Sequence, residues 1–238
     1  MNKLNTSVKV TELGDTALRL VKVFKAVAAV QNDAFLTKTF AEIEKQATAM
    51  TSAVKSDQAL SKLEEADAQR DQAIRVLDKL LKGYENIPLE NLKTHAKKLA
   101  EIFKKYGVKI TGENYASQST LINSLLGDFS ATELKPSIEA LAGVKEALAE
   151  IQTKQNAFAT LRSDYEKAQV SQKEKSSATS LRKPLLELIN KKAVPYLVAM
   201  SIAQPELFKN LTAEASEIIT STNEAIKARS KKEKKEKK

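Results

Sequence analysis

Apolar residues recur along this chain at steps of three and four residues, the spacing that aligns side chains on one face of an α-helix. One series runs through residues 36–54 and another through residues 89–106. Each series is one-sided, so each predicted helix carries a single apolar stripe that must be buried against neighbouring helices. The two series consist of Leu36, Phe40, Ile43, Ala47, Met50 and Val54, then of Leu89, Leu92, Ala96, Leu99, Phe103 and Tyr106.

Capping and helix-breaking residues divide the pattern into separate helices. Ser56-Asp57 predicts the start of a third helix and Gly83 its end, while Pro88 and Gly107 bound the fourth. Pro184 and Pro195 are expected at a helix start and at a kink. The predicted helices cover residues 15–30, 33–54, 57–83, 88–106, 113–126, 144–175 and 181–200, with a last helix from Pro205.

The chain has 238 residues but only six glycines and five prolines, too few for a turn-rich sandwich or barrel. We therefore expect an all-α fold. The expected architecture is an antiparallel helical bundle of two weakly repeated three-helix units, with an N-terminal helix and a helical connector. The predicted domains are an N-terminal helical unit (1–107), a connector with a short helix (108–142), a C-terminal helical unit (143–229) and a disordered lysine-rich tail (230–238).

A weak internal repeat supports the division into two units. Two arginines are each followed by three apolar residues and a tyrosine at offsets of 4, 7, 11 and 14. Apolar offsets are shared by any two amphipathic helices, but two arginines and two tyrosines in register go beyond that. The matched sets are Arg70, Ile74, Leu77, Leu81 and Tyr84, then Arg182, Leu186, Ile189, Ala193 and Tyr196.

Charged residues occupy apolar seam positions of the third predicted helix. Continuing its spacing places Asp67 and Arg70 where leucine would be expected. Because a buried charge must be paired and hydrogen-bonded, we expect Arg70 to form a structural network with Asp67 and Asp71, and Arg182 to be paired likewise. The alternative is that Arg70 and Arg182 anchor an anionic ligand between the two units.

Four short segments stand out in their order along the chain. They are Glu64-Glu65-Ala66-Asp67-Ala68-Gln69-Arg70-Asp71, then Phe103-Lys104-Lys105-Tyr106-Gly107, Leu121-Ile122-Asn123-Ser124-Leu125-Leu126 and Asn156-Ala157-Phe158-Ala159-Thr160-Leu161. Together they resemble the landmarks of an uncharacterised all-helical family from Bacteroidota, catalogued only as a domain of unknown function. The resemblance covers most of the chain and implies a bacterial origin and a helical body. It brings no activity and no catalytic residue, and the lysine-rich end departs from the family's pattern.

Residue types that carry chemistry are scarce. With no cysteine and one histidine, the chain lacks thiol nucleophiles, cysteine-bound metals and histidine pairs. Gly107 and Gly112 have phosphate-loop spacing, but Glu113 and Asn114 stand where lysine and serine or threonine are required. His95 lies among lysines and is predicted to be a solvated helix residue. We expect no enzyme, and predict no catalytic, cofactor-binding or metal-binding residue and no small-molecule ligand.

Positive charge is concentrated at the C-terminal end. The net charge is +9, and residues 227–238 supply six of these charges. Such a segment can contact phosphate backbones without sequence preference, or it can serve solubility alone. No stretch of about 18 apolar residues predicts a membrane span, and no secretory signal opens the chain, so a cytoplasmic location is expected. The candidate polyanion contacts are Lys231, Lys232, Lys234, Lys235, Lys237 and Lys238.

Three functions are consistent with these features of the sequence. The leading hypothesis is a non-enzymatic, soluble helical-bundle protein that acts through a protein partner or through self-association. The alternative is weak, non-specific nucleic-acid or polyanion binding through the basic end. The third, an enzyme or small-ligand carrier, requires Arg70, Arg182, Tyr84 or Tyr196 to line a pocket.

Overall fold

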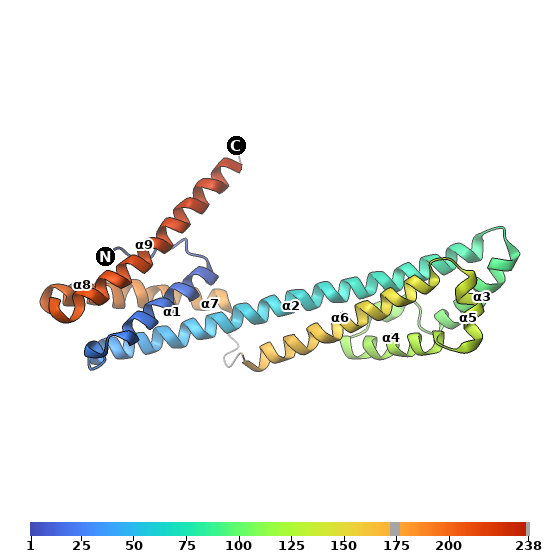
Figure 1. Cartoon of the computed structure of the whole chain (residues 1–238), viewed down its shortest axis with the longest axis horizontal. Helices are drawn as coiled ribbons and strands as arrows, with labels where there is room; N and C mark the ends of the chain where they lie inside the picture. Colours follow the sequence, from blue (N-terminus) through green and yellow to red (C-terminus); the bar gives the residue numbers. More distant parts are fainter. Residues whose placement is uncertain (172–176, 237–238) are drawn as a thin grey trace. The chain divides into compact units, whose positions relative to one another are not determined.

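The computed structural model describes residues 1–171 and 177–236. Every regular element in these two ranges is helical and none is a strand, so the predicted all-α class is confirmed (Figure 1). Within the same ranges, no helix combines the length and the apolar character needed to cross a bilayer.

The chain forms two compact units, and their limits differ from the predicted domains. We call Gln58–Lys167 the central unit, and Met1–Asp57 with Ala168–Lys238 the terminal unit. The predicted boundaries after residues 107 and 142 both fall inside the central unit. The segment expected to be a connector is therefore part of a folded body.

The difference originates in α2 (Ala34–Asn86), a continuous helix of 53 residues. The predicted break at Ser56-Asp57 is wrong because the Ser56 side chain does not cap a helix. It is buried, and its hydroxyl accepts a hydrogen bond from Gln169 Nε2 at 2.9 Å. The predicted stop at Gly83 is also wrong, since this glycine lies inside the helix. Each unit takes a different part of α2 as one of its helices.

In the central unit, α2 packs with α3 (Glu90–Lys104), α4 (Tyr115–Phe129), α5 (Lys135–Ala140) and α6 (Val144–Ser171) (Figure 1). Short 3₁₀ turns at Val108–Gly112 and Thr132–Leu134 join these helices. Side chains of all the helices named share one apolar core, which explains why residues 108–142 are not a linker. Its large members include Ile74, Leu77, Leu81, Leu99, Phe103, Ile122, Leu125, Phe129, Leu141 and Ile151.

Two glycines have a left-handed backbone at the turns of this unit. Gly107 has φ 61° and its amide donates to the Phe103 carbonyl at 2.7 Å, which ends α3 as the sequence predicts. Gly143 has φ 85° and precedes α6. A β-carbon at Gly143 would also lie 3.5 Å from the Leu80 side chain.

The terminal unit contains α1 (Val10–Ala26), α7 (Ala178–Glu187), α8 (Val194–Ala203) and α9 (Pro205–Glu236), packed with the first part of α2. A π-helix, Leu188–Ala193, links α7 to α8, and a 3₁₀ turn, Ala28–Val30, follows α1. The first helix begins five residues before its predicted start, because the Glu12 carboxylate accepts the Lys9 amide at 2.8 Å and caps it there. Phe24 and Phe40 stack in the core with ring centroids 4.3 Å apart.

The two segments that match in sequence have different backbones. Arg70 to Tyr84 lies in regular α-helix, whereas Arg182 to Tyr196 crosses the π-helix. Equal sequence offsets therefore do not give equal positions on the helix surface, because a π-helix has more residues per turn.

The lysine-rich end differs from the expected disorder as far as the structure describes it. Residues 230–236 continue α9, and the side chains of residues 231–235 are exposed. Lysine and glutamate both favour helix, and the preceding turns of α9 already supply the nucleus. Lys237 and Lys238 lie outside the described residues.

Alanine substitution should have opposite effects at two of the glycines. Gly143→Ala should lower the free energy of unfolding by about 1–2 kcal/mol, because its φ of 85° is unfavourable for residues with a β-carbon. Gly83→Ala should raise it by about 1 kcal/mol, because this helical site has open space around the added methyl group. Urea denaturation of both variants measures the two changes, and equal effects would contradict this assignment.

Candidate functional site

Polar side chains from three helices meet around Arg70 in the central unit. The Arg70 side chain is 0% exposed. Its Nη2 donates to Asp67 Oδ1 at 2.6 Å and to Gln118 Oε1 at 2.7 Å. Its Nη1 donates to Ser119 Oγ at 2.9 Å and to Gln155 Oε1 at 3.1 Å. The guanidinium group thus joins α2 to α4 and α6.

Aromatic rings cover one face of the same group. The central guanidinium carbon of Arg70 lies 3.7 Å from the centroid of the Phe158 ring, which is itself buried. Tyr115 packs edge-on against Phe158 at 5.1 Å. Stacking on a ring face suits the planar, weakly hydrated guanidinium and adds to its hydrogen bonds.

Burial and pairing act in opposite directions on the charges of this network. Burial lowers the pKa of Arg70, and the Asp67 carboxylate opposes that shift. Burial raises the pKa of Asp71, and the hydrogen bond from Gln118 Nε2 to Asp71 Oδ1, at 2.6 Å, opposes it. Because folded Asp71 holds its proton more tightly than unfolded Asp71, its contribution to stability decreases as pH rises through the raised pKa.

The network leaves Arg70 little capacity for an external anion. Four acceptors match the four N–H bonds of its two terminal nitrogens. Only Nε, which is also buried, has no hydrogen-bond partner among the described residues. The geometry is that of a structural network, with Asp67 bonded directly to Arg70 and Asp71 reached through Gln118.

Sequence reasoning missed the amide partners of Arg70, although the pattern contains a sign of them. Gln118 stands four residues before the buried Ile122, and Gln155 stands four residues after the buried Ile151. Both glutamines therefore occupy apolar seam positions of their own helices, as Arg70 does on α2. A polar residue on each of three seams indicates a shared buried contact.

Arg182 does not repeat this arrangement. It is half-buried on α7, where its Nε donates to the Val8 carbonyl at 3.0 Å and its Nη2 donates to the Thr6 carbonyl. The expectation of a carboxylate partner like that of Arg70 is therefore replaced by main-chain acceptors. The acceptors belong to the non-helical segment that precedes α1.

The two tyrosines of the sequence repeat also have separate partners. Tyr84 donates to the Ala142 carbonyl at 2.9 Å, within the central unit. Tyr196 donates to Asp33 Oδ2 at 2.7 Å, within the terminal unit, and this hydrogen bond raises the pKa of Tyr196. Each hydroxyl fixes a turn or a helix start rather than pointing into a cavity.

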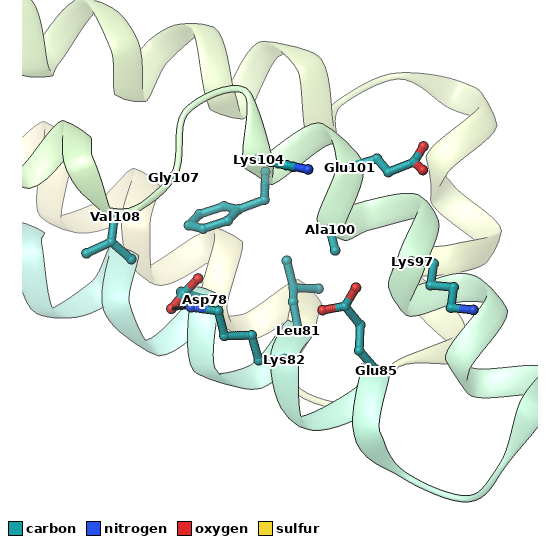
Figure 2. A pocket seen from close by; sticks show the side chains of 11 residues that line it. Asp78, Leu81, Lys82, Glu85, Lys97, Ala100, Glu101, Lys104, Gly107 and Val108 are labelled. Atoms are coloured by element: carbon teal, nitrogen blue, oxygen red, sulfur yellow. Dashed lines mark hydrogen bonds and ion pairs between the residues drawn. The ribbon is translucent and has the colours of Figure 1, made fainter.

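An open cavity of about 550 Å³ lies between α2 and α3 (Figure 2). Neither Arg70 nor Tyr84 lines it, and Asp78 and Lys82 on its wall pair with each other at 2.8 Å. Acidic and basic side chains are mixed around its rim, so it has no strong preference for one charge. Its lining consists of Asp78, Leu81, Lys82, Glu85, Lys97, Ala100, Glu101, Phe103, Lys104, Gly107 and Val108.

His95 differs from its predicted solvated state. It is half-buried, and its Nδ1 lies 3.0 Å from Ser137 Oγ, which ties α3 to α5. Ser137 is 3% exposed, so a substrate cannot reach its hydroxyl in this conformation. In the parts of the chain that the structure describes, no group of three His, Asp or Glu side chains is placed to hold a metal ion.

The basic candidates lie on the exposed end of α9. Lys231, Lys232, Lys234 and Lys235 are exposed there, two to six residues beyond Arg229. The Arg229 guanidinium instead pairs with Glu12 of α1.

Fold and site together define an all-α protein of two units, each containing buried polar contacts that join its helices. A comparison with protein-family models matches residues 60–232 to the family of unknown function DUF6261. The match covers more than half of the chain, so the chain belongs to this family, and the resemblance to a domain of unknown function is confirmed. No curated protein and no solved structure matches it.

Replacing Arg70 should strongly destabilise the central unit. Arg70→Met should lower the free energy of unfolding by about 3–5 kcal/mol, because it removes the cation and leaves Asp67 and two buried amides without their donor. Arg75→Met is a suitable control, since Arg75 lies on the same helix, is half exposed and is 4.0 Å from Asp71. The control should change stability by about 0.5 kcal/mol or less. Guanidinium denaturation measures both, and equal values would contradict a structural role for Arg70.

Proposed function

We propose that this protein is a non-enzymatic helical-bundle protein that acts through protein–protein contacts, and that one of these contacts is self-association through α8. The observation that carries the proposal is a row of exposed apolar side chains on α8 and at the start of α9. Ile202 is 79% exposed and Leu207 is 39% exposed. Pro195, Ala199 and Ala203 are exposed beside them.

The exposed residues of α8 share one helix face. Pro195, Ala199 and Ile202 follow each other at steps of four and three residues, and Val194–Ala203 contains no charged residue. Phe35, 43% exposed, extends the apolar surface by stacking on Tyr196 at 4.4 Å. Single exposed apolar residues are ordinary, but a contiguous face indicates an interaction surface.

The charges that flank α8 fit a second copy of the same chain. Lys192, in the π-helix before α8, and Glu206, in the first turn of α9, are both exposed. Two α8 helices packed antiparallel would place the Lys192 end of one copy beside the Glu206 end of the other. The small side chain of Ala199 permits close approach of the two helices, and a two-fold contact uses the same patch twice.

Substituting Ile202 should weaken self-association. We expect the protein to dimerise at about 100 µM or below, and Ile202→Lys to weaken the dimer at least about tenfold by placing charge in its apolar centre. Val170→Lys is the matched control, because Val170 is 85% exposed but lies on α6. Analytical ultracentrifugation measures the dissociation constants.

Charge exchange tests the antiparallel register. Lys192→Glu should weaken the dimer, and the double variant Lys192→Glu with Glu206→Lys should restore it. A monomeric protein at about 100 µM, or equal weakening by the Val170 and Ile202 variants, would refute self-association through α8.

A second candidate function is contact with polyanions through α9. The observation that favours it is the helical placement of Lys231, Lys232, Lys234 and Lys235, which spaces exposed charges by one to four residues on adjoining faces. Such a cluster attracts phosphate groups by releasing counterions, without base recognition.

Neutralising this cluster should remove polyanion binding. Changing all four lysines to glutamine should abolish micromolar binding to duplex DNA, RNA and heparin at low salt, measured by fluorescence anisotropy. The control carries the same loss of net charge on other exposed lysines of the terminal unit. It replaces Lys22, Lys38, Lys183 and Lys209. If both quadruple variants lose binding equally, net charge and not the α9 cluster is responsible.

A further inference from the structure

Residues 1–9 lie against the helices of the terminal unit as a segment that is neither helix nor strand. Apart from a turn at Thr6-Ser7, they have no secondary structure of their own. Leu4 and Val8 are each 1% exposed and belong to the apolar core of this unit. The side chains between and beside them are mostly exposed.

Two asparagines bind the main chain of this segment at paired points. Asn190, in the π-helix, accepts the Leu4 amide on Oδ1 and donates from Nδ2 to the Leu4 carbonyl, both at 2.8 Å. Asn223, on α9, accepts the Asn5 amide at 2.8 Å and donates to the Lys3 carbonyl at 2.9 Å. Each side-chain amide thus meets a main-chain donor and acceptor as a neighbouring β-strand would.

Two arginines bind carbonyls further along the segment. Arg182 donates to the Val8 and Thr6 carbonyls, and Arg229 Nη2 donates to the Ser7 carbonyl at 3.2 Å. All these bonds go to main-chain atoms, so they place little demand on the sequence that is bound. The sequence requirement comes from the buried sites of Leu4 and Val8.

Among the described residues, the segment has no main-chain hydrogen bond to α7 or α9. Its own main-chain bonds run from the Val8 amide to the Asn5 carbonyl and from the Leu13 amide to the Lys9 carbonyl. Removing residues 1–8 from the surface would therefore break side-chain bonds and the apolar contacts of Met1, Leu4 and Val8, while the helix ladders of α7 and α9 stay intact.

We infer that Arg182, Asn190, Asn223 and Arg229 form a peptide-binding site, which residues 1–9 occupy within the same chain. Its ligand in a partner protein is a non-helical segment with two aliphatic residues four positions apart and a turn between them. The site combines main-chain recognition by polar side chains with two apolar anchors. Residues 1–9 compete with that ligand, so the site opens only when they are displaced.

The test uses the full chain with Leu4→Asp and Val8→Asp, two changes that weaken the binding of residues 1–9 to the site. A fluorescent peptide with the sequence of residues 1–9 should bind this variant saturably, and bind the unaltered protein at least about tenfold more weakly because of competition. Adding Asn190→Ala and Asn223→Ala should weaken binding at least about tenfold more, whereas adding Asn210→Ala, an exposed site on α9, should not. A peptide with Leu4→Asp should not bind.

Two results would overturn the inference. One is a folded variant, with unchanged helical circular dichroism, that fails to bind the peptide or binds it equally well without Asn190 and Asn223. The other is loss of helical structure in the variant, which would make the segment an integral part of the fold. Hydrogen exchange of the unaltered protein gives a separate check: the Leu4 and Asn5 amides should exchange well before those of α9. Peptide binding should persist in an Ile202→Lys background, which separates this site from self-association.

Discussion

A buried positive charge sets the strongest constraint on the central unit. Arg70 is removed from water, so the donors of its two terminal nitrogens need acceptors inside the protein. α2 supplies the carboxylate, while α4 and α6 supply two amides and a hydroxyl. These acceptors have directional requirements that apolar packing lacks. The network therefore fixes the axial positions of three helices whose apolar stripes alone would tolerate sliding.

The terminal unit meets a related constraint with the roles reversed. There the groups removed from water are main-chain amides and carbonyls of residues 1–9, and side chains satisfy them. In the central unit one side chain gathers partners from several helices, whereas here several helices contribute partners to one segment. Both arrangements depend on polar residues that lie among apolar ones, and neither involves a metal-binding cluster in the described parts of the chain.

Local sequence features predicted what depends on local physics. The all-α class, the left-handed Gly107 after α3 and the start of α9 at Pro205 all follow from spacing, capping and backbone preference. Asp67 beside Arg70 followed from charge on an apolar seam. The continuity of α2 through Ser56, and the main-chain partners of Arg182, depend on contacts between residues more than 100 positions apart. No local pattern contains that information.

The π-helix at Leu188–Ala193 gives the terminal unit a local tolerance to a change of chain length. Each residue of an α-helix turns the chain by about 100°, and a π-helix accommodates its extra residue without ending the helix. Loss of a single codon in this stretch would allow an ordinary α-helix to form, and the faces of α7 and α8 would keep nearly the same relation around the helix axis. The same loss inside α8 would instead turn every later side chain of that helix by about 100°. The π-helix is therefore a place where the chain can change its length by one residue while the surface of α8 stays the same.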